Sequence, residues 1–198
     1  MPELKPAAII LAAGAAKRMH YPKPWLRFDR DSSFLSKIIE AYNAFGCGEV
    51  IAILNEENSG ARWNKELDKL PENTCVVINH QPAKGRFYSL QLGVRQLQNA
   101  EFCFIHNVDN PFINTGTLSP IYREKIAEGY ASPVYKGSGG HPILIGKKII
   151  SDIHSATADN SNLRTFLKPY LCKNVKMRDD AVLRNINTRE EYGKFFKQ

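Results

Sequence analysis

The sequence has no long apolar run and few cysteines, and each shortage excludes a class of protein. Nothing in its 198 residues approaches the roughly 18 consecutive apolar residues of a membrane-spanning helix. The four cysteines lie far apart, in or beside apolar runs, and form no C-x-x-C pair (Cys47, Cys75, Cys103 and Cys172). Isolated thiols of this kind are typical of a reduced protein. We therefore expect no disulfide framework, no zinc site, no membrane partner and a cytoplasmic location.

The N-terminal stretch AAIILAAGAA (7–16) also lacks the features of a secretory signal. A signal has a longer centre rich in leucine, whereas this stretch contains few large side chains. It follows Glu3 and leads into Lys17 and Arg18, which is not the usual surrounding of a cleavage site. We interpret it as a buried strand followed by a tight loop.

Acidic residues are fewer than basic ones, 20 against 27, which gives a net charge of +7. Such a balance suits an anionic ligand: a nucleotide, a phosphorylated small molecule or nucleic acid. The basic residues are scattered along the chain, and no aromatic and basic repeat of the RNA-recognition kind occurs. We therefore expect a small anionic partner and no nucleic acid.

Repeats, low-complexity segments and linkers are missing too, so we expect one domain over residues 1–198, with enough hydrophobic residues (43%) for a substantial core. Apolar runs alternate with amphipathic stretches, which predicts an α/β fold with helices on both faces of a mostly parallel sheet. Segments 131–135 and 141–146, around a glycine cluster, predict a small antiparallel or mixed edge. The predicted strands are 7–11, 49–54, 74–79 and 101–107, and the predicted helices are 34–45, with Ser32 or Ser33 as its cap, 60–70, 88–99, 115–128, 160–171 and 188–197.

Both common nucleotide-binding fingerprints, G-x-G-x-x-G and the Walker motif, are absent. In open α/β sheets the ligand lies at the carboxyl ends of the strands, so the residues just after each apolar run are informative. After the first run, LAAGAAKRMHYPKP (11–24) offers small residues for a close backbone approach, and Arg18 and Lys23 can meet an anion. A turn with two solvated bases fits the spacing equally well.

Asp109 follows the predicted strand that ends at Asn107. A carboxylate at this place can hold Mg²⁺, which prefers one or two carboxylates together with phosphates and water. Asp-Asn-Pro is also an ordinary turn sequence. His106 and Asn107 are more typical of strand-end packing or of a turn than of a ligand.

Two further segments follow predicted strands. In QPAKGRFYSL (81–90), Gly85 permits a sharp turn, Arg86 can meet phosphate or ribose, and Ser89 either caps the next helix or contacts a nucleotide. In GSGGHPILI (137–145) a flexible glycine turn leads to His141, and a lone histidine is more often structural or solvated than catalytic.

Taken in order, these segments resemble a known family. LAAG-x-x-x-RM followed by a P-K pair, G-x-x-x-SL, V-D-x-P-F, GHP and N-I-N-T are similar to motifs of the nucleotidyltransferases of molybdenum cofactor biosynthesis, the molybdopterin cytidylyl- and guanylyltransferases. The resemblance spans residues 7–195. It implies a Rossmann-like, three-layer nucleotidyltransferase fold (GT-A-like), shared with sugar-nucleotide and methylerythritol-phosphate cytidylyltransferases. It also implies a Mg²⁺-dependent enzyme that joins a nucleoside triphosphate to a phosphorylated small-molecule acceptor.

The resemblance implies roles for individual residues. Arg18, Lys23 and Asp109 would be catalytic, Asp109 with Asn187 would hold the metal, and Gly140 and His141 would border the acceptor. The residues that would bind the nucleotide are Leu11, Ala12, Ala13, Gly14, Arg18, Lys23, Gly85 and Ser89.

Some positions depart from the family pattern. Ala16 stands where Gly or Ser is usual, which keeps the site open. Pro24 and Trp25 replace leucines, so we expect a remodelled acceptor side.

Two more departures concern the nucleotide base. NSNLRTFL (160–167) keeps Arg164 but has Asn160 where the cytidylyl group has an acidic residue, with Asp159 one place early. Asn185 and Asn187 are nearer the guanylyl pattern. The identity of the nucleotide, CTP or GTP, therefore stays open. So does the acceptor: a molybdopterin-like compound or a sugar, alcohol or aminoalcohol phosphate. A non-catalytic nucleotide-binding module is a further alternative.

Overall fold

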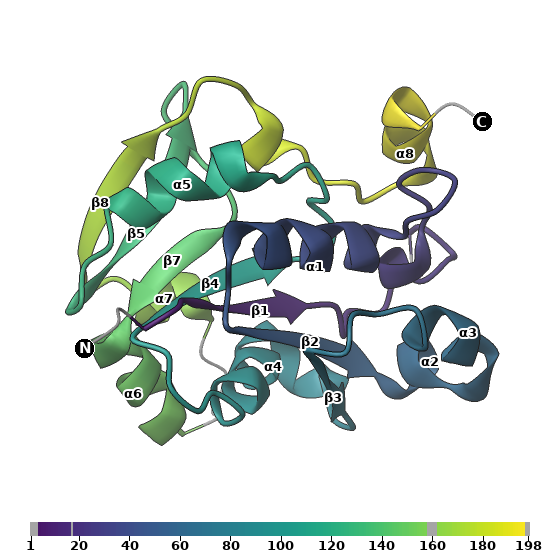
Figure 1. The fold of residues 1–198 in the computed structure, drawn as a ribbon, viewed down its shortest axis with the longest axis horizontal. Coiled ribbons are helices and arrows are strands. Elements are labelled where there is room, and N and C mark those ends of the chain that lie inside the picture. The colour runs from purple at the N-terminus through teal and green to yellow at the C-terminus, as the bar shows by residue number, and fades with distance from the viewer. Residues whose placement is uncertain (1–3, 17, 158–161, 197–198) are drawn as a thin grey trace.

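The computed structural model describes residues 4–16, 18–157 and 162–196. An eight-stranded sheet runs through it in the order β3-β2-β1-β4-β7-β5-β6, and β8 pairs with β5 (Figure 1). The strands β1 to β4 are mutually parallel where they pair, whereas β7 is antiparallel to β4 and to β5. The bounds are β1 Ala7–Leu11, β2 Glu49–Asn55, β3 Thr74–Asn79, β4 Phe102–Asn107, β5 Gly129–Tyr135, β6 Ser138–Gly139, β7 Ile143–Gly146 and β8 Leu171–Lys176. The predicted parallel sheet with a mixed edge is confirmed.

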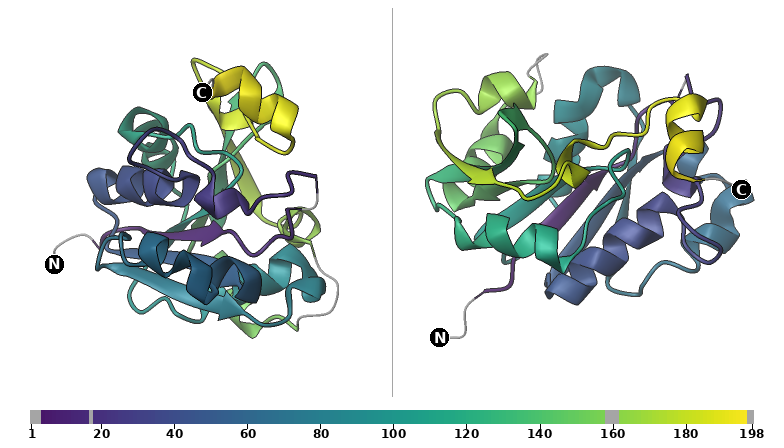
Figure 2. Two further views of the ribbon diagram at one scale, coloured as in Figure 1. Left: turned by 90° about the vertical axis from the view of Figure 1, so that its right-hand side faces the viewer. Right: turned by 90° about the horizontal axis from the view of Figure 1, so that it is seen from above.

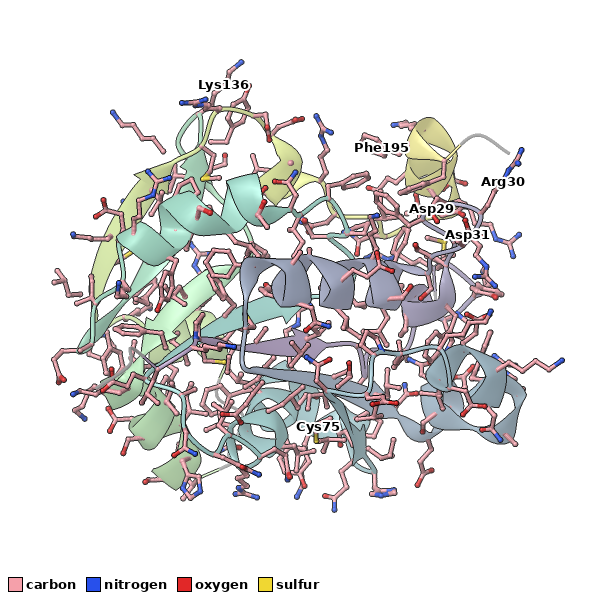
Figure 3. The ribbon with its side chains drawn as sticks, in the orientation of Figure 1. Asp29, Arg30, Asp31, Cys75, Lys136 and Phe195 are labelled. Carbon is pink, nitrogen blue, oxygen red and sulfur yellow. The ribbon has the colours of Figure 1, made fainter. Side chains whose placement is uncertain are left out.

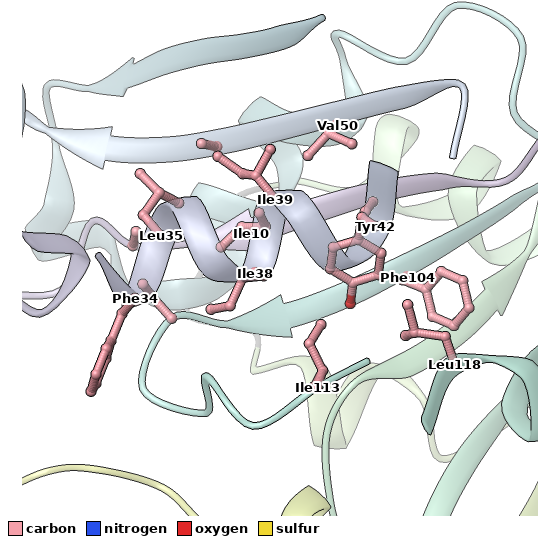
Figure 4. Packing of buried hydrophobic residues seen from close by; sticks show 14 of the residues in the cluster. Ile10, Phe34, Leu35, Ile38, Ile39, Tyr42, Val50, Phe104, Ile113 and Leu118 are labelled. Atoms are coloured by element: carbon pink, nitrogen blue, oxygen red, sulfur yellow. The ribbon is translucent and has the colours of Figure 1, made fainter. Parts of the chain in front are cut away.

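Helices cover both faces of the sheet, because successive side chains of a strand point to opposite faces. On β1, Ala8 and Ile10 belong to the hydrophobic cluster under α1 and α5, whereas Ala7, Ile9 and Leu11 belong to the cluster under α4 and α6. Figure 4 shows the first cluster from close by. The three-layer architecture is therefore confirmed. The helix bounds are α1 Phe34–Phe45, α2 Glu56–Ser59, α3 Asn64–Leu67, α4 Gly85–Val94, α5 Thr115–Arg123, α6 Lys147–Ser155, α7 Leu163–Phe166 and α8 Arg189–Phe195.

Helix α1 follows directly from its sequence. Ser33, one of the two predicted caps, accepts a hydrogen bond from the Ser36 main chain, and the Ser36 hydroxyl accepts one from the Ser33 main chain. The apolar residues recur at helical spacing and are buried, and Gly46 ends the helix in the left-handed region at φ +96°.

Several predicted helices have different bounds in the structure. The segment 60–70 holds only the 3₁₀ turn Ala61–Trp63 and the short α3, since Gly60 and Pro71 limit it on both sides. Helix α4 begins three residues earlier than predicted and ends at Val94, and α5 ends at Arg123.

The sequence analysis missed α6 and β8. The prediction of a helix over 160–171 was mostly wrong, since its described part contains only the short α7 before β8 begins. Strand β8 lies at the edge of the sheet and buries only Val175 fully, so it has no continuous apolar run that a sequence reading would detect. Its parallel pairing with β5 stabilises it instead. Helix α6 fully buries only Ile149 and Ile153, which explains why its pattern was overlooked.

The segments that the sequence predicts to form the site meet at one edge of the sheet. The carboxyl ends of β1 to β4 meet there, and the antiparallel β7 brings residues 140–142, just before it, to the same edge, since Ile105 pairs with Ile143. Helix α8 lies beside the loop that follows β1 (Figure 2). Just beyond this helix, the centre of the Phe196 ring lies 5.4 Å from that of Phe28 in the loop, and 5.6 Å from that of Phe112 after β4. The half-exposed Phe195 of α8, labelled in Figure 3, also packs against Phe112, with ring centres 5.1 Å apart.

Among the helices of the described residues, none combines the length and the apolar character needed to cross a bilayer.

Candidate active site

The loop after β1 is held to the neighbouring strand by hydrogen bonds. The Ala12 N–H donates to the Ile53 carbonyl at 2.9 Å. The side-chain amide of Asn58 donates to the Ala12 carbonyl at 2.9 Å, and that of Asn55 donates to the Ala13 carbonyl at 3.1 Å. Neither asparagine was predicted from the sequence as part of the site. Their signal was an Asn-Glu-Glu-Asn stretch at the end of a predicted strand, an ordinary helix cap on local grounds.

Lys23, Asp109 and Asn187 meet at the centre of the site, although they are far apart in the chain. Lys23 begins a 3₁₀ turn that ends at Trp25. Its ammonium donates to Asp109 Oδ2 at 3.2 Å and to Asn187 Oδ1 at 2.8 Å. The side chains of Lys23 and Asp109 are 17% and 16% exposed, so the ion pair is mostly shielded from water. The structure thus brings together three residues to which the family resemblance assigned roles.

The main chain positions the two oxygen-bearing partners. The Val108 N–H donates to the Leu11 carbonyl at 3.2 Å, which ties the turn after β4 to the end of β1. The Ile186 N–H donates to the Asp109 carbonyl at 2.7 Å, and the Asn187 N–H donates to Glu191 of helix α8 at 2.6 Å. A capping box between Thr188 and Glu191 begins that helix. Asn187 is therefore held between the turn after β4 and the start of α8.

The donor set at this point fits a magnesium ion. Asp109 Oδ1 is buried and has no hydrogen-bond partner among the described residues. With Oδ2 and the Asn187 amide oxygen it offers hard oxygen ligands of the kind that Mg²⁺ takes. No group of three or more His, Cys, Asp or Glu side chains arranged for a metal occurs in the described part of the chain. An ion held here would therefore complete its coordination with water and ligand phosphates, as Mg²⁺ commonly does.

A pocket of about 370 Å³ surrounds these groups, and we call it the Lys23 pocket. Nearly every residue predicted to bind a nucleotide or metal lines it. The exception is Ala12, which is 1% exposed and lies behind the pocket wall. The predicted residues that line the pocket are Leu11, Ala13, Gly14, Arg18, Lys23, Gly85, Ser89, Asp109 and Asn187.

The segment after β3 closes one side of this pocket. Gly85 has φ +86°, a conformation that favours glycine, and it makes the sharp turn into α4. Of the two roles predicted for Ser89, the helix cap is wrong, because α4 begins at Gly85 and Ser89 lies inside it. The Ser89 hydroxyl accepts a hydrogen bond from the buried Asn79 amide at 2.9 Å. Its own proton remains available for a ligand in the Lys23 pocket.

A second pocket, of about 960 Å³, adjoins the first, and we call it the His141 pocket. The two share Leu11, Gly85, Arg86 and Asn107. Asn107 is buried at the end of β4, as expected of a strand-end residue, and it also lines both pockets. Among the described residues the lining contains basic side chains but no Asp or Glu; its charged and apolar members are Lys84, Arg86, Arg164, Leu11, Phe87, Ile105, Ile143, Leu163 and Leu167.

Gly140 and His141 lie at the mouth of β7 and both line the His141 pocket. A Cβ atom on Gly140 would come within 2.3 Å of the Val182 carbonyl oxygen, so only glycine fits there. His141 Nε2 accepts from the Asn107 amide at 2.8 Å, and its Nδ1 is buried without a partner among the described residues. Burial lowers the pKa of His141; the nearby Asp109 opposes this and Arg86 adds to it. The imidazole is therefore neutral near pH 7 and presents an Nδ1–H group.

His106 has the structural role expected of it. It is fully buried, its Nε2 donates to the Asn110 carbonyl at 2.7 Å, and its Nδ1 accepts from the Tyr42 hydroxyl at 2.8 Å. Burial lowers its pKa to about 3, so the ring is neutral at ordinary pH.

Trp25, one of the two departures from the family pattern after Lys23, is an interior residue. It is 2% exposed, lies outside both pockets and stacks on Trp63 with ring centres 5.7 Å apart. Its indole N–H donates to the Asn58 carbonyl at 2.9 Å. Of the remaining departures, Asn185 is exposed and lines neither pocket, and Asp159 and Asn160 lie outside the described residues.

The chain is similar to known proteins in sequence and in fold. Residues 8–176 match the family model of the MobA-like NTP transferase domain. The chain is 25% identical over 187 residues to the molybdenum cofactor cytidylyltransferase of Escherichia coli, covering 93% of this chain and 92% of that one. It is also 25% identical over 195 residues to the nicotine blue oxidoreductase of Paenarthrobacter nicotinovorans, covering 92% of each. The crystal structure of Rv0371c from Mycobacterium tuberculosis superposes with a TM-score of 0.82 at 20% identity and covers 100% of both chains.

Proposed function

Because this chain belongs to the MobA-like NTP transferase domain family, we propose that it transfers a nucleoside monophosphate from CTP or GTP to a phosphorylated acceptor. The observation that carries the proposal is the meeting of Lys23, Asp109 and Asn187 in a pocket beside the loop after β1. A cation, a free carboxylate oxygen and an amide oxygen in one pocket match the needs of a triphosphate with its metal.

The reaction follows from the charges in the two pockets. An oxygen of the acceptor phosphate attacks the α-phosphorus, a new P–O bond forms, and the bond to the β-phosphate breaks so that pyrophosphate leaves. A phosphate is already a nucleophile at neutral pH, so no general base is required. Arg18 and Lys23 neutralise charge on the triphosphate and on the leaving group. Mg²⁺ held by Asp109 and Asn187 would supply further neutralisation of the phosphate oxygens.

The His141 pocket is the proposed place of the acceptor. Lys84, Arg86 and Arg164 attract a phosphorylated molecule, and no carboxylate of the described residues in the lining repels one. The volume of about 960 Å³ and the apolar side chains suit an acceptor with a large ring system rather than a short polyol. These features favour a molybdopterin-like acceptor over a sugar, alcohol or aminoalcohol phosphate, which is the second candidate.

The cellular location belongs to the same proposal. Cys47 and Cys103 are buried free thiols, which are typical of a reducing compartment, and we propose the cytoplasm.

Pyrophosphate release tests the proposal. The protein is incubated with Mg²⁺, each of the four common triphosphates and a panel of phosphorylated pterins, sugars, alcohols and aminoalcohols. We expect release that depends on CTP or GTP and is fastest with a ring-bearing acceptor. Release only with a small polyol phosphate would favour the second candidate. Triphosphate binding without release on any acceptor would favour a non-catalytic nucleotide-binding module.

A further inference from the structure

Asn58, in the short helix α2, contacts the loop after β1 at two places. One is Ala12, in the first arm of the loop (residues 12–16), and the other is Trp25, in the second arm (the 3₁₀ turn Lys23–Trp25). Asn58 is 2% exposed. Its side-chain amide donates to the Ala12 carbonyl at 2.9 Å, and its main-chain carbonyl accepts from the Trp25 indole at 2.9 Å. Its main-chain N–H donates to Asn55 Oδ1 at 2.7 Å, which fixes the orientation of α2 on β2. We infer that Asn58 is a positioning residue that aims the polyphosphate-binding groups of this loop into the Lys23 pocket.

The first arm is positioned through its peptide planes. A trans peptide points its C=O and the next N–H in opposite directions. Asn58 draws the Ala12 carbonyl toward α2, and Asn55 draws the Ala13 carbonyl the same way. The N–H groups of Ala13 and Gly14 consequently point away from α2. Because both residues line the Lys23 pocket, those groups are directed toward a ligand there.

The second arm is positioned through Trp25. This residue shares a single 3₁₀ turn with Lys23, and the indole is anchored by the Asn58 carbonyl and by stacking on Trp63. Fixing the indole fixes the turn, and with it the start of the Lys23 side chain. Asn58 therefore fixes the position of the loop N–H groups relative to the Lys23 ammonium.

Packing and hydrogen bonds both hold the start of the loop. Ala12 and Ala13 are buried members of the two hydrophobic clusters of the core. Because apolar packing is non-directional, the hydrogen bonds of Asn58 and Asn55 set the directions of the two peptide planes.

The inference rests on the proposed function, and binding of inorganic tripolyphosphate, CTP and GTP to the full chain tests it. Asn58→Asp keeps the shape of the side chain but replaces the donor with a second acceptor opposite the Ala12 carbonyl. Asn58→Ala removes the hydrogen bond altogether. Gln91→Ala is the matched control, because Gln91 is also a buried amide that donates to main-chain carbonyls, those of Ile153 and Ala156. Thermal unfolding of each variant reports the structural loss separately.

We expect both Asn58 variants to weaken tripolyphosphate binding about tenfold to a hundredfold, the value of one or two charge-assisted hydrogen bonds. Gln91→Ala should lose a similar amount of stability and keep wild-type affinity. Equal binding by the Asn58 variants and Gln91→Ala would overturn the positioning role and leave the proposed function intact. Failure of the wild-type protein to bind tripolyphosphate, CTP or GTP would overturn both.

Discussion

The ammonium of Lys23 lies 3.2 Å from the carboxylate of Asp109, although 86 residues separate them in the chain. Both side chains are mostly shielded from water, and Asn187 shares the ammonium at 2.8 Å. A triphosphate that enters the Lys23 pocket would meet this cation directly. The pair therefore connects the loop after β1 with the carboxyl end of β4 at the proposed reaction centre.

Asp109→Asn should abolish pyrophosphate release, because the amide supplies less negative charge for a metal at this place. The asparagine can still accept from Lys23, so the thermal midpoint should shift by no more than about 4 °C, equivalent to about 1 kcal/mol for a chain of this size. Activity assays and thermal unfolding of the same preparation measure both. Normal turnover would remove Asp109 from the site.

Lys23→Ala should lower turnover more than triphosphate affinity, because the lysine meets charge that shifts to the leaving pyrophosphate. A loss of about 2.7 to 4 kcal/mol, roughly a hundredfold to a thousandfold in rate, is expected if the contact resembles an oxyanion donor. Arg18→Ala should act in the same direction.

Lys148→Ala is the control for Lys23, since Lys148 also pairs with an aspartate, Asp152, and lines neither pocket. It should leave the rate near normal. Lys17, a nearer candidate by sequence, lies outside the described residues. Equal, near-normal rates for Lys23→Ala and Lys148→Ala would mean that the loop after β1 is only a turn.

Asn187→Asp should tighten binding of Mn²⁺, used as a spectroscopic substitute for Mg²⁺, because a second carboxylate joins Asp109. Asn185→Asp is the control: it adds the same charge two residues away, at an exposed position outside both pockets. Electron paramagnetic resonance titration with CTP present measures the affinity. If both variants tighten Mn²⁺ binding to the same extent, Asn187 acts through general charge and is not a ligand.

His141→Ala should raise the acceptor KM or lower turnover, with little change in triphosphate affinity, since His141 lines the His141 pocket but not the Lys23 pocket. His154→Ala, an exposed histidine at the end of α6, should change neither quantity. Steady-state kinetics with the triphosphate and the acceptor varied separately distinguish the two effects. A matching loss of triphosphate binding would place His141 on the nucleotide side.

The stability of the protein should fall as the pH drops below about 6.5, the usual pKa of histidine. In the folded chain the pKa of His106 is lowered to about 3, so the unfolded chain binds a proton first. The contribution of neutral His106 to the free energy of unfolding is complete above about pH 6.5 and is lost progressively as the pH falls toward about 3. Urea unfolding at several pH values measures the slope. His106→Gln should be less stable at pH 7 and show a shallower slope; an unchanged slope would exclude His106 as its source.

Local patterns in the sequence were sufficient for much of the fold. Strand β1 and helix α1 follow from short-range periodicity, because which side chains are buried repeats every two residues in a strand and about every 3.6 in a helix. The rule that ligands lie at the carboxyl ends of parallel strands identified the segments around Gly14, Gly85 and Asp109, and all three line one pocket. The family motifs added Asn187, which periodicity would not have singled out.

The tertiary structure alone decided how these segments meet. Lys23 reaches Asn187 across 164 positions, and no local pattern encodes that distance. Strand β8 forms because β5 offers it an edge, and the Trp25 indole bonds to Asn58 because the 3₁₀ turn directs its ring toward α2. Sequence periodicity reports which side of an element is buried, whereas the order of strands in the sheet determines which buried sides and which loops come together.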